Sequence, residues 1–252
     1  MSFLDRLHPS SRTPGDAEPN IAYFVARLGG EAEEWAVEYT RPEHVELMAL
    51  TEQGVRALRA RRIEEGSRAL QRAESILRAT SGTVSQEVHL LLGRWYYQAL
   101  AYYFYAREDF AGADAALDHG EELVRRAIQG RPFLVPYAMR CYELWCHRLR
   151  LARAQRLWPE LSRRVEITRR MVEGEGPLCV LDDGTAVDIA AVKAFYARFE
   201  DLDEREARPL RRVVNDESRR RHLLSVLSDV YAVPGFVIPY APEPGLRAAA
   251  HP

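Results

Sequence analysis

The stretch GVRALRARRIEEGSRALQRA at residues 54–73 decides the fold, because its pattern recurs at residues 101–120, AYYFYAREDFAGADAALDHG. In both stretches six positions, at successive spacings of 3, 6, 3, 4 and 3, hold small or apolar residues. Spacings of three and four place residues on one face of a helix. Each stretch therefore predicts a pair of antiparallel helices. The shared positions are Gly54, Ala57, Ile63, Gly66, Leu70 and Ala73 in the first stretch and Ala101, Phe104, Phe110, Ala113, Leu117 and Gly120 in the second.

The residue types at these positions suit a closely packed helix pair. Gly54 on the first helix and Gly66 on the second are small enough to let the two helices approach each other. We expect Ile63 to fill the turn between the helices and Leu70 to fill the shared core. The same roles fall to the equivalent residues of the second stretch.

This pattern resembles the tetratricopeptide repeat, whose helix pairs carry small, large and turn-filling residues at these spacings. The resemblance covers about residues 46–173 and includes a weaker third pair. The family's period is about 34 residues, whereas here the turn-filling residues lie 47 apart, from Ile63 to Phe110, and then 41 apart, to Leu151. The sequence predicts an all-α fold of stacked antiparallel helix pairs, either a tetratricopeptide-repeat-like α-solenoid or an irregular bundle. The third pair rests on Trp145, Leu151, Ala154, Trp158 and Leu161.

The chain around the repeats divides into three parts. We expect a flexible N-terminal arm at 1–17, a single helical domain at 18–232 and a proline-rich C-terminal tail at 233–252. One short β-hairpin is expected near 178–187, around the turn at Asp183-Gly184. Helices are expected at 19–28, 31–39, 42–61, 63–79, 86–107, 109–128, 134–150, 152–173, 188–200, 203–214 and 216–231.

Two helix starts carry capping signals. Thr40 and Glu43 match a capping box, and Pro42 falls in the first turn, where its missing N–H is no loss. Ser85 is placed to cap the helix that follows it.

The resemblance also implies where a ligand would bind, because the first helix of each tetratricopeptide pair lines a peptide-binding groove. Carried over position by position, the groove residues are Trp95, Gln98, Tyr102 and Tyr105 in the second pair, and Val55 and Arg59, with Thr51 and Leu58, in the first. Tyrosine and tryptophan suit such a surface, since they offer a large stiff apolar area and one polar group. The competing interpretation is that this aromatic helix is buried on both sides within the stack.

Two functions from different classes follow. The first is a protein- or peptide-binding adaptor or scaffold that uses this aromatic groove. The second is a helical enzyme or small-ligand-binding protein with an internal cavity lined by the same aromatics. Self-association as a homodimer is a further expectation. Of the basic residues that recognise a peptide's C-terminal carboxylate in this family, only Arg59 matches, so we do not expect that mode.

Arginine is over-represented in the chain. Lysine and arginine total 35, and Lys193 is the single lysine, so the other 34 are arginine. Aspartate and glutamate are interleaved with most of the arginine clusters, which favours solvated helix faces with i,i+4 ion pairs. The formal net charge of −2 indicates no bulk attraction to nucleic acid or to an anionic membrane.

The sequence contains no clear catalytic, cofactor or metal motif. Cys141, Cys146 and Cys179 give no disulfide framework, and we interpret the first two as thiols of the core. Asp114, Asp118 and Glu122, beside His119, are interpreted as a solvated acidic face. The first twenty residues lack an apolar signal region, and no apolar run reaches the length of a membrane span, so we expect a cytoplasmic protein without a cofactor.

Overall fold

The computed structural model describes residues 21–199, 202, 210 and 215–231. Within them the chain is all-α apart from one short β-hairpin, as the sequence predicted. The expected arm at 1–17, the expected tail at 233–252 and nearly all of the expected helix at 203–214 lie outside the described residues.

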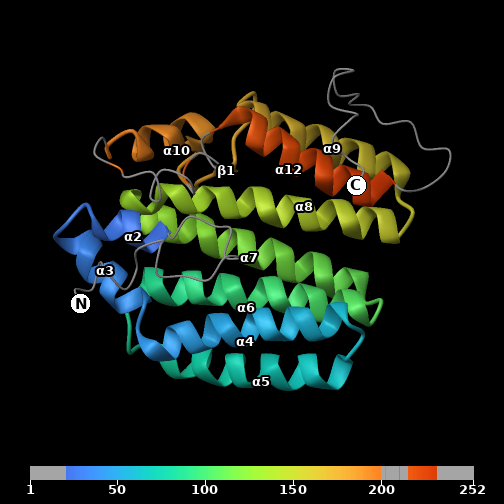
Figure 1. The fold of residues 1–252 in the computed structure, drawn as a ribbon, viewed down its shortest axis with the longest axis horizontal. Helices are drawn as coiled ribbons and strands as arrows, with labels where there is room; N and C mark the ends of the chain where they lie inside the picture. Colours follow the sequence, from blue (N-terminus) through green and yellow to red (C-terminus); the bar gives the residue numbers. More distant parts are fainter. Residues whose placement is uncertain (1–20, 200–201, 203–209, 211–214, 232–252) are drawn as a thin grey trace.

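The long helices lie side by side in a layered stack (Figure 1). Its order is α5, α4, α6, α7 and α8, with α9 and α12 together on the far side of α8. The short helices α2 and α3 lie at one end of the stack, next to the 3₁₀ helix η2 and α6. The elements are α2 (Ile21–Ala26), α3 (Glu31–Tyr39), α4 (Pro42–Arg59), α5 (Ile63–Thr80), α6 (Gln86–Ala106), α7 (Phe110–Gly130), η2 (Pro132–Ala138), α8 (Met139–Ala154), α9 (Trp158–Glu173), β1 (Cys179–Val180), β2 (Ala186–Val187), α10 (Ile189–Tyr196) and α12 (Asp216–Tyr231).

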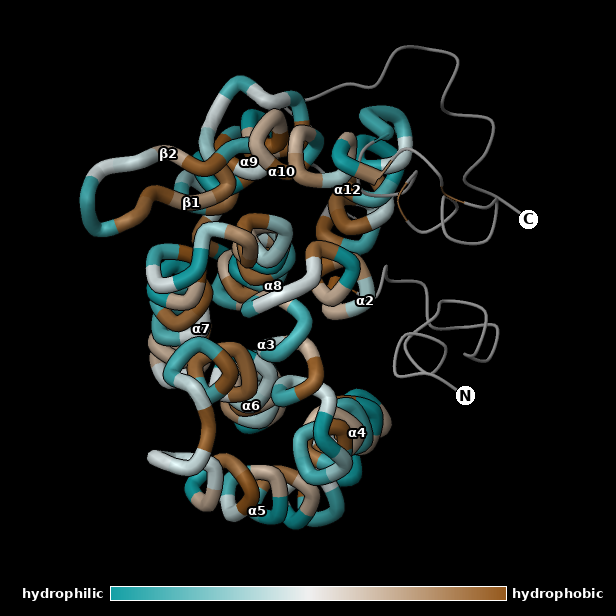
Figure 2. The backbone as a smooth tube through the Cα atoms, turned by 90° about the vertical axis from the view of Figure 1, so that its left-hand side faces the viewer, coloured by the Kyte–Doolittle hydropathy of each residue, from teal (hydrophilic) through white to brown (hydrophobic). Residues whose placement is uncertain are grey.

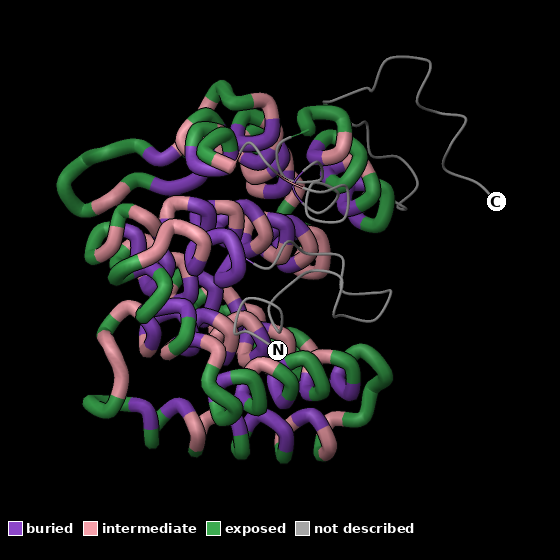
Figure 3. Tube along the Cα trace, turned by 60° about the vertical axis from the view of Figure 1, so that its left-hand side comes forward, coloured by how far each residue is buried: buried purple, intermediate pink, exposed green. Residues whose placement is uncertain are grey.

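The core runs through the stack from end to end. Helix α2 is buried at all six of its residues, and the edge of its Phe24 ring meets Tyr196 and Phe199, each at 5.5 Å between centroids. Around α5, by contrast, hydrophobic and hydrophilic residues alternate, and its exposed residues lie on the outer side of the stack (Figures 2 and 3). Helix α5 therefore forms one edge of the stack, whereas α2 is buried on all sides.

Three helix pairs are joined by the same turn. In α4–α5, α6–α7 and α8–α9, one residue of each turn has a positive φ: Arg61 at 61°, Glu108 at 62° and Arg156 at 58°. The hydrogen bonds around these residues also match, because the next amide in each turn donates to the carbonyl five residues before it. The second helix begins two residues after the positive φ each time, at Ile63, Phe110 and Trp158.

The small residues predicted to bring the first pair together do so. A Cβ atom placed on Gly66 would lie 2.6 Å from Leu58 Cγ and 3.3 Å from the carbonyl oxygen of Gly54. Leu70 is buried beside them, and Ile63 packs against the same cluster. Gly66 therefore allows the close contact of α4 and α5, whereas a Cβ on Gly54 would lie no nearer than 3.4 Å to its neighbours.

The third pair corrects the sequence prediction. Leu151 was expected to fill its turn, but it lies within α8, buried, and the turn comes at residues 155–157. Trp158 is the residue equivalent to Ile63 and Phe110, which makes the successive intervals 47 and 48 residues. Pro159 lies in the first turn of α9, where its missing N–H costs no helical hydrogen bond.

Both capping predictions were wrong in their hydrogen bonds. Helix α4 begins at Pro42 after Arg41, and the hydroxyl of Thr40 donates instead to the carbonyl of Ala36 in α3. Ser85 does precede α6, but its Oγ donates to Glu38 Oε2 at 2.5 Å. In both places the hydroxyl that would have capped the next helix bonds to α3 instead, to a carbonyl in the case of Thr40 and to the Glu38 carboxylate in the case of Ser85.

The β-hairpin forms where it was expected. Cys179 pairs with Val187 and Val180 with Ala186 in antiparallel register, and Gly184 occupies its turn with φ 85°. Cys141, Cys146 and Cys179 are buried free thiols, which confirms the interpretation of the first two as core residues.

Candidate functional site

Three residues at equivalent positions face the same side of the helix pairs. Val55, Tyr102 and Arg150 each lie eight residues before the first residue of the second helix in their pair. All three are half-buried. Two of them, Val55 and Tyr102, are predicted groove residues, and Arg150 adds a third member from α8.

Tyr102 is held between two helices. Arg59 Nη2, from α4, donates to the Tyr102 hydroxyl at 2.7 Å, and the guanidinium lies 5.0 Å from the centre of the ring. The Tyr102 ring also meets the His147 ring of α8 in a T-shaped contact, with centroids 5.1 Å apart. The tyrosine therefore links α4, α6 and α8 at this surface.

His147 is fixed at both ring nitrogens. Arg150 Nη1 donates to Nδ1 at 3.2 Å, and the amide of Gln98 lies 2.9 Å from Nε2. An arginine can only donate, so Nδ1 accepts from Arg150 and Nε2 carries the proton of the neutral imidazole. The Gln98 amide accepts that proton in the orientation that turns its oxygen, rather than its nitrogen, toward Nε2.

The surroundings of His147 are strongly positive. Burial, followed by the charges of Arg150, Arg94 and Arg59, lowers the pKa of His147 to about 3. The imidazole is therefore neutral at neutral pH, and it serves as a hydrogen-bonding group between cations.

Two of the arginines around His147, Arg59 and Arg150, have no carboxylate partner within the described part of the chain. Arg94 and Arg140 each donate to Glu143, at 2.6 and 2.7 Å. Arg59 and Arg150, by contrast, bond to a hydroxyl and an imidazole, and no carboxylate of the described residues lies within ion-pair distance of either. This surface thus carries two positive charges that the described part of the chain does not neutralise.

The other predicted residues lie apart from this group. Trp95 Nε1 donates to the Tyr39 hydroxyl at 2.9 Å, so its indole anchors α3 onto α6. Tyr105 is 40% exposed near the other end of α6, with its ring edge against Phe110. Val55 packs in the same small apolar cluster as Tyr102. The structure therefore brings together Arg59, Val55, Gln98 and Tyr102, and leaves Trp95 and Tyr105 to either side of them.

Sequence reasoning missed His147 and Arg150. The spacing between successive turns could have revealed them, because aligning the third pair on Trp158 places Arg150 at the position equivalent to Tyr102. The alignment on Leu151 hid this equivalence.

Within the described part of the chain, no helix combines the length and the apolar character needed to cross a membrane. The same residues hold no group of three or more histidine, cysteine, aspartate or glutamate side chains that could bind a metal ion. Comparison of the chain with protein-family models, with curated proteins and with solved structures found no match.

Proposed function

We propose that this protein is a cytoplasmic, non-catalytic adaptor that binds an acidic protein or peptide segment across α4, α6 and α8. The observation that carries the proposal is the pair Arg59 and Arg150, which have no carboxylate partner among the described residues. Arg59 bonds to Tyr102, and Arg150 bonds to the His147 ring that meets Tyr102. An acidic side chain or main-chain carbonyl of the segment would supply the missing acceptors.

Three features support this surface as a binding face. The tyrosine and arginines are of the types that dominate binding energy at protein interfaces. Their hydrogen bonds to each other and to His147 hold them in place, which lowers the entropy lost on binding. The resemblance to the tetratricopeptide repeat, with its peptide-binding groove and solenoid stacking, belongs to the same proposal, and the recurring turn of the three helix pairs agrees with it.

The cytoplasmic assignment rests on the cysteines. All three are buried as free thiols and form no disulfide, as expected in a reducing compartment.

The proposal is tested with a random peptide library displayed on phage and selected on the immobilised wild-type protein. We expect the enriched peptides to be rich in aspartate and glutamate. Their affinities, measured by fluorescence anisotropy, should fall at least tenfold for the double variant Arg59→Ala, Arg150→Ala, and should also fall as salt is raised.

A control variant removes the same charge elsewhere. Arg56→Ala, Arg72→Ala alters two exposed arginines that pair with Glu52 and Glu46. Affinity should change less than twofold. Enrichment of no peptide would contradict the binding function, and equal loss in both double variants would contradict the location.

A further inference from the structure

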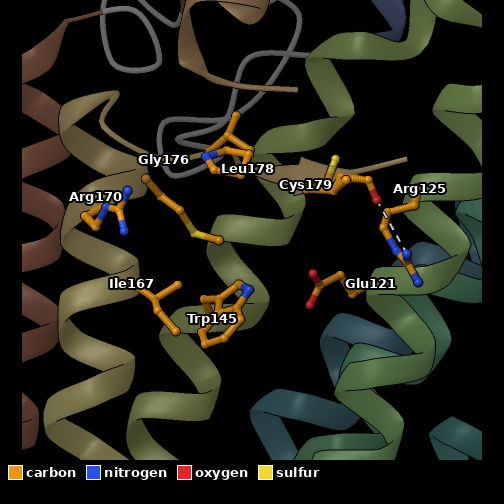
Figure 4. Close-up of a pocket in the computed structure, with 11 residues that line it drawn as sticks. Glu121, Arg125, Trp145, Ile167, Arg170, Gly176, Leu178 and Cys179 are labelled. Atoms are coloured by element: carbon orange, nitrogen blue, oxygen red, sulfur yellow. Dashed lines mark hydrogen bonds between the residues drawn. The ribbon is translucent and has the colours of Figure 1, made fainter. Parts of the chain in front are cut away.

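A pocket of about 380 Å³ lies between α7, α8, α9 and the β-hairpin, away from the surface described above. Figure 4 shows Glu121 and Arg125 entering it from α7, Trp145 from α8, and Ile167 with Arg170 from α9. The segment at residues 176–180 closes one side. No residue of the Arg59–Tyr102 surface lines this pocket.

Much of the lining is apolar. Met171, Leu178 and Cys179 are buried, and Ile167 and the Trp145 ring are half-buried beside them. Such a surface favours a ligand with an apolar body.

One hydrogen-bond donor of the pocket finds no acceptor among the described residues. Trp145 Nε1 is buried, and none of these residues accepts a hydrogen bond from it. Figure 4 shows this nitrogen on the side of the indole that faces the Glu121 carboxylate. A buried donor without an acceptor is unfavourable, so a group that accepts from Trp145 would be held strongly here.

Arg148 holds both of these groups in place. This buried arginine donates to Glu121 Oε2 at 2.5 Å and to Asp118 at 2.7 Å. Its guanidinium also lies 4.8 Å from the Trp145 ring centre. The acceptor oxygens of Glu121 and the donor of Trp145 are therefore preorganised.

The lining carries charges of both signs, so the place of the head group decides which of them it meets. A head group that accepts from Trp145 lies on the side of the indole that faces the Glu121 carboxylate, which would repel an anion at that point (Figure 4). A cationic ligand would be repelled by the guanidinium groups of Arg125 and Arg170. The Trp145 ring offers it no cation–π contact in return, because Arg148 already lies over that ring.

We propose that this pocket binds a small uncharged molecule with an apolar body and a head group, such as a primary amide or a hydroxyl, that accepts a hydrogen bond from Trp145 and donates one to Glu121. The site is independent of the proposed adaptor surface, and its ligand differs in class from an acidic peptide.

The test follows the indole N–H signals of the full-length protein by ¹H–¹⁵N NMR, with the Trp145 signal identified by its loss in Trp145→Phe. The probe is 3-phenylpropanamide, and the matched probes are 3-phenylpropanoate and 3-phenylpropylamine. We expect a saturable shift of the Trp145 signal with the amide, and at least tenfold weaker binding of the two ions.

Two variants separate the pocket from a general effect on the fold. Trp145→Phe should weaken amide binding about tenfold, as followed by the backbone signals of Leu178 and Ile167, while Trp158→Phe, which lies outside the pocket, should leave it unchanged. If Trp145→Phe does not fold, Ile167→Trp serves instead, since it fills the pocket from α9 and should abolish binding.

Absence of a saturable shift with the amide at millimolar concentration would overturn the proposal and leave the pocket to water. Equal or tighter binding of either ion would overturn the assigned ligand class. Unchanged amide binding in Trp145→Phe and in Ile167→Trp would overturn the location.

Discussion

The first and third helix pairs have turns of the same conformation, but residues of different size hold the two helices of each pair together. In α4–α5, Gly54 and Gly66 face each other, and the helices approach until a single methyl group would collide with Leu58. In α8–α9 the equivalent positions hold Leu149 and Leu161, both fully buried. The backbones of α8 and α9 accordingly approach each other at fewer places.

The third pair also depends on charge. Arg164 Nε donates to Glu160 at 2.6 Å, and its Nη groups reach Asp114 in α7 and the carbonyl of Arg148 in α8. The turn thus sets the direction of the second helix, while the residues between the helices set their separation.

Truncation of the buried leucine should affect the third pair most. Leu161→Ala leaves a cavity where α8 and α9 rely on large side chains, and should lower the free energy of unfolding by about 3 kcal/mol. Urea denaturation measures the change. Leu157→Ala, four residues earlier and 44% exposed, is the control and should change it by less than about 0.5 kcal/mol.

The opposite substitution should disturb the first pair. Gly66→Ala places a methyl group 2.6 Å from Leu58 Cγ, and the resulting strain outweighs the gain in helix propensity, for a net loss of about 1 to 2 kcal/mol. Gly120→Ala is the matched change in α7, where the nearest atom lies at 3.6 Å. It should raise stability by up to about 1 kcal/mol. Equal stabilisation by both changes would contradict the close approach of α4 and α5.

The ion pairs of α9 should make the contribution of this helix to the free energy of unfolding depend on pH. Hydrogen bonds from Arg163 and then Arg164 lower the pKa of Glu160 to about 2. A lowered pKa in the folded state means that the stabilisation is complete above the unfolded value of 4.5 and is lost as the pH falls toward 2.

Glu160→Gln measures this contribution. The variant should be less stable than the wild type by about 1 kcal/mol at pH 7, after allowance for solvent screening. The two proteins should converge between pH 4.5 and 2 in parallel urea titrations. A difference that stays constant across this range would show that Glu160 acts by packing rather than by charge.

The smallest effect should come from the shared turn. Glu108 has φ 62°, which disfavours a residue with a Cβ, so Glu108→Gly should stabilise the protein by about 0.5 to 1 kcal/mol. Asp109→Gly, at φ −82°, should instead destabilise it slightly, because the Asp109 side chain accepts from the amide of Gly112. Thermal or urea denaturation distinguishes the two signs, and a loss of stability in Glu108→Gly would show that the turn does not strain the backbone.

Much of the fold could be predicted, because apolar periodicity and turn residues are local signals. The helix at 31–39 and the hairpin around Gly184 fall where they were expected. The end of α8 falls later than expected, because residues 151–154 continue its helical pattern. The turn that follows has Arg156 at a positive φ, so no glycine marks it in the sequence.

The site could be predicted only in part. Arg59, Gln98 and Tyr102 followed from the resemblance to known helix pairs, and the structure brings them together. His147 and Arg150 depended on the alignment of the third pair, and the pocket at Trp145 depends on contacts between α7, α8, α9 and the hairpin that no local pattern contains.

If Arg59 and Arg150 select an acidic segment, exchanging their charge should reverse the preference of this surface. Anisotropy titrations would compare a library-selected acidic peptide with its lysine-substituted copy, on the wild type and on the variant Arg59→Glu, Arg150→Glu. We predict that the wild type binds the acidic peptide at least tenfold more tightly and that the variant reverses this preference. An unchanged preference for the acidic peptide in the variant would contradict the account.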